Sequence, residues 1–178
     1  MIIDHFHFDE IKQFFTYWRE MTPEAYIPAK HNLDPTKIPK LLPYIWLCSR
    51  DSKHNTFMYN LVGDVVRNTI NRPMRGRFLN EIFNAEWSER LNARYQRVCE
   101  EPAMYHGCGK VYGVYEKKSG VGERLILPLM GESGQIDHVV GLTFYLLVQK
   151  DKAPDIVINA APGESGEYIP LPCAIPSG

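Results

Sequence analysis

The segment from Val139 to Val148 constrains the fold most, because it is apolar on both sides of an extended chain. Alternate residues of a strand point to opposite faces, and here both the odd-numbered and the even-numbered residues are mostly apolar. A strand of this kind lies in the middle of a sheet that is covered on both faces. The run is about half as long as the roughly 20 residues that a membrane-spanning helix needs, so we expect no membrane partner.

Five segments have the composition of strands, and the apolar run belongs to the last of them. The five lie at about residues 44–50, 56–62, 103–117, 123–130 and 138–150. Polar turn residues separate the neighbours at positions 51–55, 119–120 and 132–134. Short turns of this kind join antiparallel strands. We therefore expect one sheet of five antiparallel strands.

Two segments are predicted to be the main helices. The first, at about residues 9–21, carries an apolar stripe made by Phe8, Ile11, Phe15 and Trp18. The second, at about residues 84–101, has apolar residues on one face at helical spacing. With the short elements before it, the second helix should cover one face of the sheet. The first helix could cover the other face or meet a second subunit, so the predicted class is α+β.

Length and composition indicate one folded domain with ordinary globular character. The chain has 178 residues, and we divide it into an amphipathic helix at 1–22, a central domain at 23–150 and a proline-rich extended tail at 151–178. A formal net charge of −1 gives no overall attraction to nucleic acid. No basic, apolar leader is evident and no cysteine pair has metal-knuckle spacing, so we expect a cytoplasmic protein with reduced cysteines.

The order of the elements, together with several short motifs, resembles the stand-alone PAS-like family that is common in alphaproteobacteria. The motifs are Tyr17-Trp18, Asp34-Pro35, Leu42-Pro43, Leu61-x-Gly63 and an Arg-x-x-x-Gly motif that ends at Gly76. The resemblance covers about residues 8–148 and departs from the family at Asp64, where Thr or Ser is frequent. It implies a PAS-like five-stranded antiparallel sheet with helices on one face and an N-terminal helix. It also implies a sensor or interaction domain, without naming a ligand.

The resemblance further implies a pocket between the sheet and the helices that follow the second strand. Candidate lining residues are Trp46, Met58, Asn60, Trp87 and Tyr112. The same residues could simply fill the core. The long helix has no histidine for a haem and no flavin-reactive cysteine motif is present, so no cofactor is predicted.

Arginines gather between the second strand and the long helix. Arg67, Arg72, Arg75 and Arg77 could hold a carboxylate or phosphate, because guanidinium groups form paired hydrogen bonds to such anions. The alternative is a solvated basic face that is balanced by nearby acidic residues.

Two groups of residues could carry metal or thiol chemistry. His106 and Cys108 lie two apart on a predicted strand and so share a face, where they could form a thiolate pair or two metal ligands. His5 and His7, with Asp4 and Asp9 nearby, could also bind a metal. Buried cysteines are more often inert and N-terminal segments often fray, so we expect no metal site and no catalytic residue.

The sequence supports three hypotheses for function. The first is a regulatory PAS-like module that binds a small molecule or a signalling protein and passes the signal on by non-covalent contacts. It would form a homodimer through Phe8, Ile11, Phe15 and Trp18. The alternative is a small enzyme on a cone-shaped α+β fold that uses a pocket His or Asp, with His106 and Asp64 as the first suspects. The third is an interaction domain with a filled core.

Overall fold

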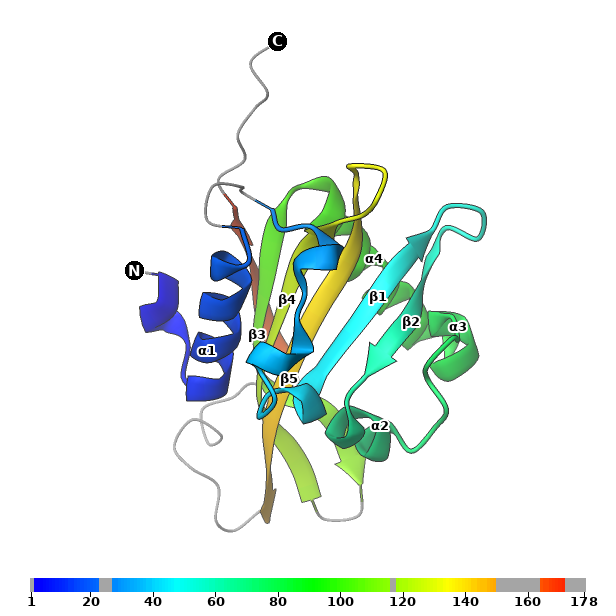
Figure 1. Cartoon of the computed structure of the whole chain (residues 1–178). Helices are drawn as coiled ribbons and strands as arrows, with labels where there is room; N and C mark the ends of the chain where they lie inside the picture. Colours follow the sequence, from blue (N-terminus) through cyan, green and yellow to red (C-terminus); the bar gives the residue numbers. More distant parts are fainter. Residues whose placement is uncertain (1, 23–26, 116–117, 150–163, 172–178) are drawn as a thin grey trace.

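The computed structural model describes residues 2–22, 27–115, 118–149 and 164–171, and the side chains within these ranges except those of 110–121 and 147–149. Its centre is one antiparallel sheet (Figure 1). The strands are β1 (Ile45–Asp51), β2 (Thr56–Val62), β3 (Ala103–Tyr115), β4 (Lys118–Met130), β5 (Ile136–Gln149) and β6 (Glu164–Pro170). Their order across the sheet is β2-β1-β5-β4-β3-β6.

The apolar strand lies where its composition predicts. β5 pairs with β1 on one side and with β4 on the other. It is covered from both faces, because its even-numbered Val140 and Leu142 belong to one buried cluster and Val139 to the other. The α+β class is confirmed, but the sheet has six strands rather than the expected five.

Helices cover both faces of the sheet (Figure 1). One face carries α1 (Asp9–Glu20) and the short 3-10 turns η1 (Ile2–His5), η2 (Lys30–Asn32), η3 (Pro35–Lys37) and η4 (Leu42–Tyr44). The other face carries α2 (Asp64–Ile70), α3 (Leu79–Ile82) and α4 (Ala85–Glu100). The described ranges contain no helix with the length and apolar character that crossing a bilayer requires.

The first helix covers the sheet of its own chain, which corrects the proposed dimer interface. Ile11 and Trp18 have no exposed surface and Phe15 is 7% exposed, while Phe8 is half-buried against Phe144. The indole Nε1 of Trp18 donates a hydrogen bond of 3.1 Å to the carbonyl of Pro128 on β4. The apolar positions of β4 and β5 need a cover, and α1 supplies it within the same chain. Ile11, Phe15 and Trp18 are therefore core residues of their own chain in this arrangement.

Aromatic rings fill the space between the sheet and α4. Trp46 stacks on Tyr95 with ring centres 5.1 Å apart, and Phe57 meets Tyr95 edge-on at 5.4 Å. The hydroxyl groups of Tyr59 and Tyr95 lie 3.2 Å apart. All four residues are less than 5% exposed. The region where a PAS pocket was expected is thus occupied by packed side chains.

Two of the family-like motifs meet in space. Gly63 follows β2, and a β-carbon built on it would overlap the backbone of Leu42 and Pro43 in η4. Only glycine permits this approach, which explains why a Leu-Pro pair and a Leu-x-Gly step occur together.

The sixth strand comes from the segment that we assigned to an extended tail. β6 pairs with β3 from Ala103 to Gly109, and a buried carboxylate fixes it there. Glu164 accepts hydrogen bonds from Arg94 (3.2 Å), Arg124 (3.0 Å) and the Tyr105 hydroxyl (3.2 Å). Residues 151–163 and 172–178 of the predicted tail lie outside the described residues. Residues 164–170 are extended as expected, but they belong to the sheet.

Candidate functional site

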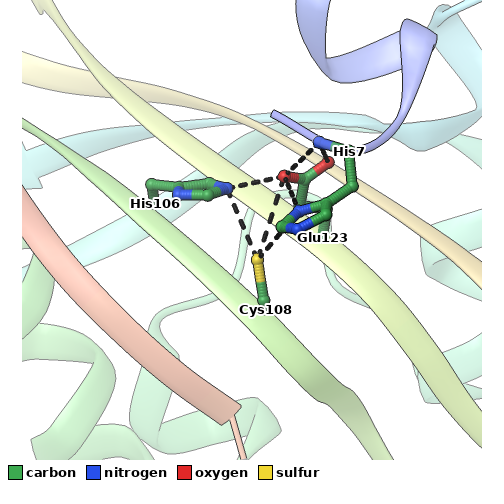
Figure 2. A group of neighbouring side chains, drawn as sticks. All are labelled: His7, His106, Cys108 and Glu123. Atoms are coloured by element: carbon green, nitrogen blue, oxygen red, sulfur yellow. Dashed lines mark hydrogen bonds and ion pairs between the residues drawn. The ribbon is translucent and has the colours of Figure 1, made fainter. Parts of the chain in front are cut away.

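Four side chains with metal-ligand chemistry meet on the face of the sheet that α1 covers (Figure 2). They are His7, His106, Cys108 and Glu123, called here the His–Cys–Glu cluster. His106 and Cys108 are alternate residues of β3, so their side chains share a face. Glu123 on β4 is the direct antiparallel partner of Cys108. His7 reaches the cluster from residues 2–8, the N-terminal segment that precedes α1.

Glu123 is the centre of the cluster and is completely buried. Its Oε1 lies 2.7 Å from Nε2 of His106 and accepts from the backbone amide of His7 at 3.0 Å. Its Oε2 accepts from the amide of Phe8 at 2.9 Å. Burial by itself would raise the pKa of Glu123, but the hydrogen bonds from His106 and from these two amides outweigh it and lower the pKa. The carboxylate is therefore ionised.

His106 is the charged partner of this carboxylate and is 6% exposed. Burial disfavours the imidazolium, but the hydrogen bonds to Cys108 and Glu123 outweigh it and raise the pKa of His106 to about 10. The ring also packs edge-on against Phe6, with ring centres 5.1 Å apart. Its second nitrogen, Nδ1, lies 3.8 Å from Oε1 of Glu167 on β6.

Cys108 and His7 complete the cluster on its more exposed side. The sulphur of Cys108 lies 3.5 Å from Nε2 of His106, 3.7 Å from Nδ1 of His7 and 3.8 Å from Oε1 of Glu123. Cys108 is half-buried, and the side chain of His7 is 45% exposed. Solvent therefore reaches the cluster along these two side chains.

The sequence indicated part of this cluster. His106 and Cys108 do share a face, as their spacing predicts. Of the N-terminal residues considered for a metal, only His7 belongs to the cluster; Asp9 is exposed and pairs with Lys12 at 3.4 Å. Glu123 was missed, although the two charged residues Glu123 and Arg124 at the start of the predicted strand 123–130 were a usable signal.

The residues proposed for a ligand pocket do not come together. Trp46 is buried in the core, whereas Trp87 is 43% exposed beneath the guanidinium of Arg90. Met58 and Asn60 are half-buried and alternate with the core residues of β2, and Asn60 accepts a 2.9 Å hydrogen bond from Ser49. The side chain of Tyr112 lies outside the described residues.

The arginines proposed for an anion site are also dispersed. All four are exposed, Arg67 pairs with Asp64 at 3.0 Å, and Arg72 donates to the carbonyl of Ile82 at 2.6 Å. The arginines that do converge are Arg94 and Arg124, which share Glu164 on the α4 face of the sheet.

The residues of the enzymatic alternative do not converge either. Asp64 lies at the exposed start of α2, whereas His106 is held by Glu123 on the α1 face. Among the described contacts, none joins them.

An open hollow of about 510 Å³ lies between the β1–β2 turn and α4. Its lining includes His54, Phe78, Ser88 and Asn92, and none of the proposed pocket residues.

A comparison with known protein families agrees with the architecture. A family model described as PAS domain matches residues 7–144, which include all four members of the His–Cys–Glu cluster. Among solved structures, the chain is similar to a sensory box sensor histidine kinase from Vibrio cholerae, with 15% identity and a TM-score of 0.41 over 62% of this chain and 87% of that chain. No curated protein matches the chain significantly. The family match spans most of the sequence and confirms the resemblance drawn from its motifs, so this chain belongs to the PAS domain family.

Proposed function

We propose that the chain is a sensory PAS module that receives its input at the His–Cys–Glu cluster and transmits it through the N-terminal segment and α1. The observation that carries the proposal is the position of Glu123. One buried carboxylate accepts from the backbone amides of both His7 and Phe8 while it holds the imidazole of His106. A ligand that binds this carboxylate must therefore also change the hydrogen bonds that hold the N-terminal segment.

The route from the cluster to α1 is a chain of packed rings. Phe6 is 3% exposed and lies against His106 on one side and Phe15 of α1 on the other, at ring-centre distances of 5.1 Å and 5.5 Å. Close-packed interiors transmit displacement, because they hold few voids that could absorb it. A shift of His106 or Glu123 is therefore passed to Phe6 and from there to the helix. The signal leaves by non-covalent contact of the N-terminal segment and α1 with a partner.

The packing on the α4 side supports an input on the α1 side. A ligand between the sheet and α4 would have to displace Trp46, Phe57 or Tyr95, which fill that space. Creating room there would forfeit several well-packed ring contacts. The His–Cys–Glu cluster, by contrast, is reached from solvent past Cys108 and His7.

Hydrogen–deuterium exchange on the full chain tests this function. We expect Glu123→Gln to speed amide exchange in residues 2–8 and in the first turn of α1, because the charged acceptor of the His7 and Phe8 amides is lost. The matched control is Glu164→Gln, which alters a carboxylate that is 7% exposed on the opposite face and should leave residues 2–8 unchanged. Equal exchange of these residues in Glu123→Gln and in the original protein would refute the proposed route.

A second candidate is a pure interaction domain, which the filled core between the sheet and α4 favours. In that case the partner is a signalling protein or a second copy of the chain, and the His–Cys–Glu cluster only holds the N-terminal segment in place. Native mass spectrometry separates these outcomes, because it reports both the number of chains in the particle and any bound mass. The number of chains tests the predicted homodimer, and the cytoplasmic location stays a prediction.

A further inference from the structure

We propose that the His–Cys–Glu cluster is a binding site for a divalent transition metal ion of the Zn²⁺ class. The ligands are Nδ1 of His7, Nε2 of His106, Sγ of Cys108 and Oε1 of Glu123. This inference rests on the proposed function, since it names the input that the cluster receives. It replaces our expectation that the chain has no metal site.

The separations from the Cys108 sulphur are those of a compact tetrahedral site, and the two from Oε1 of Glu123 are shorter. With zinc bonds of about 2.0–2.3 Å, neighbouring ligand atoms of a tetrahedral site lie about 3.3–3.8 Å apart. The sulphur of Cys108 lies 3.5, 3.7 and 3.8 Å from the other three donor atoms. Oε1 of Glu123 lies 3.1 Å from Nδ1 of His7 and 2.7 Å from Nε2 of His106. All four atoms are within 4.8 Å of one another, so outward shifts of about half an ångström suffice to accept the ion.

The donor types select the class of ion. Two imidazole nitrogens, one thiolate and one carboxylate are a mixed set that zinc accepts, whereas Mg²⁺ and Ca²⁺ prefer oxygen ligands. The thiolate and the carboxylate together balance the two charges of the ion. Binding replaces the proton between His106 and Glu123 and the proton of the Cys108 thiol, which are both released to solvent.

The surroundings of the cluster hold the ligands in place before an ion arrives. Oε2 of Glu123 is fixed by the amide of Phe8, which leaves Oε1 aimed at the other donors. The outer nitrogen of His106 faces Glu167 at 3.8 Å, as ligating histidines commonly face a carboxylate. Glu123 and His106 are buried, while Cys108 and His7 give the ion a way in.

The ion pair between His106 and Glu123 does not by itself explain the arrangement. Each of these two side chains already has its charged partner at 2.7 Å. A sulphur and a second imidazole are nevertheless directed at the same carboxylate oxygen, from β3 and from the N-terminal segment. A shared ion accounts for all four positions at once (Figure 2).

Titration with Co²⁺ and Zn²⁺ tests the site on the full chain after treatment with a chelator. We expect one ion per chain, with the intense visible bands of tetrahedral Co²⁺ and a sulphur-to-cobalt charge-transfer band, both lost when Zn²⁺ is added. Cys108→Ser and His7→Ala should each weaken binding at least about tenfold, since each removes one ligand. His7→Ala keeps both backbone amides that donate hydrogen bonds to Glu123, so the variant should still fold.

The matched control is His54→Ala, which removes an exposed histidine that pairs with Asp51 in the β1–β2 turn. It should leave the affinity and the Co²⁺ spectrum unchanged. Absence of a charge-transfer band, or equal loss of binding in His54→Ala and Cys108→Ser, would overturn the metal site.

Hydrogen–deuterium exchange, measured beside the metal titration, separates this inference from the proposed function. Zinc that binds at the cluster without changing amide exchange in residues 2–8 would keep the metal site and refute the sensory route. If Glu123→Gln exchanges faster but the original protein binds no metal, the route is kept and the metal site is refuted.

Discussion

Glu123 and His106 form a buried pair in which Oε1 of the carboxylate lies 2.7 Å from Nε2 of the imidazole. The pair joins neighbouring strands, β4 and β3, and also anchors the residues that precede α1. On the other face of the same strands, Arg124 and Arg94 hold Glu164 of β6. The sheet thus carries one buried ionic network on each face, and each network attaches a terminal segment of the described chain.

Removing the charge of Glu123 should lower stability strongly. Glu123→Gln leaves the imidazolium of His106 in a buried site without its counter-charge, and breaking a buried pair in this way costs about 3–5 kcal/mol. Urea unfolding of metal-free protein measures the effect. Glu100→Gln is the control, because its ion pair with Arg50 is largely exposed and should contribute less than about 1 kcal/mol. Similar losses in the two variants would contradict the role assigned to Glu123.

Trp18→Ala should destabilise the fold and leave the oligomeric state of the folded fraction unchanged. The side chain is fully buried against β4, and truncating a buried tryptophan costs about 3–5 kcal/mol. Denaturant unfolding and light scattering after gel filtration measure the two effects. Trp87→Ala, which removes a tryptophan that is 43% exposed, should change stability far less. A stable monomer made from a dimeric parent by Trp18→Ala would restore the discarded interface.

Glu164→Ala should release β6 from the edge of the sheet. Arg94 and Arg124 are about 10% exposed and would lose the carboxylate that they share, so β6 loses its main anchor. We expect faster amide exchange in residues 164–170 and along β3, measured by mass spectrometry. Ser165→Ala, whose hydroxyl makes only an exposed 3.4 Å hydrogen bond, serves as the control. Unchanged protection of β6 in Glu164→Ala would show that backbone pairing alone holds the strand.

Alkylation should distinguish the cysteines of the described chain. Burial raises the pKa of Cys99 to about 12 and raises the pKa of Cys48 as well, so both remain uncharged thiols at pH 8. Cys108 is half-buried and reachable from solvent. Iodoacetamide at pH 8, followed by peptide mass spectrometry, should label Cys108 and spare Cys48 and Cys99. Adding Zn²⁺ should protect Cys108, and labelling of Cys99 in the native protein would contradict its burial.

Local patterns were sufficient to predict β1 to β5 and their antiparallel pairing, but not β6. The two-sided apolar run predicted a central strand, and β5 lies between β1 and β4. Turn residues predicted antiparallel pairing, and the spacing of His106 and Cys108 placed them on one face. Each of these inferences depends on residues that are close in the sequence, because strand alternation and turn geometry are local properties.

The sequence by itself therefore determined the α+β class, the PAS family and the central place of β5. Only the tertiary structure decided that α1 covers its own sheet, that residues 164–170 form a sixth strand, and that His7 joins Glu123. The physical reason is that these contacts join segments far apart in the chain. An apolar stripe specifies that it must be buried but not against what, and a charged side chain does not specify the distant partner that will neutralise it.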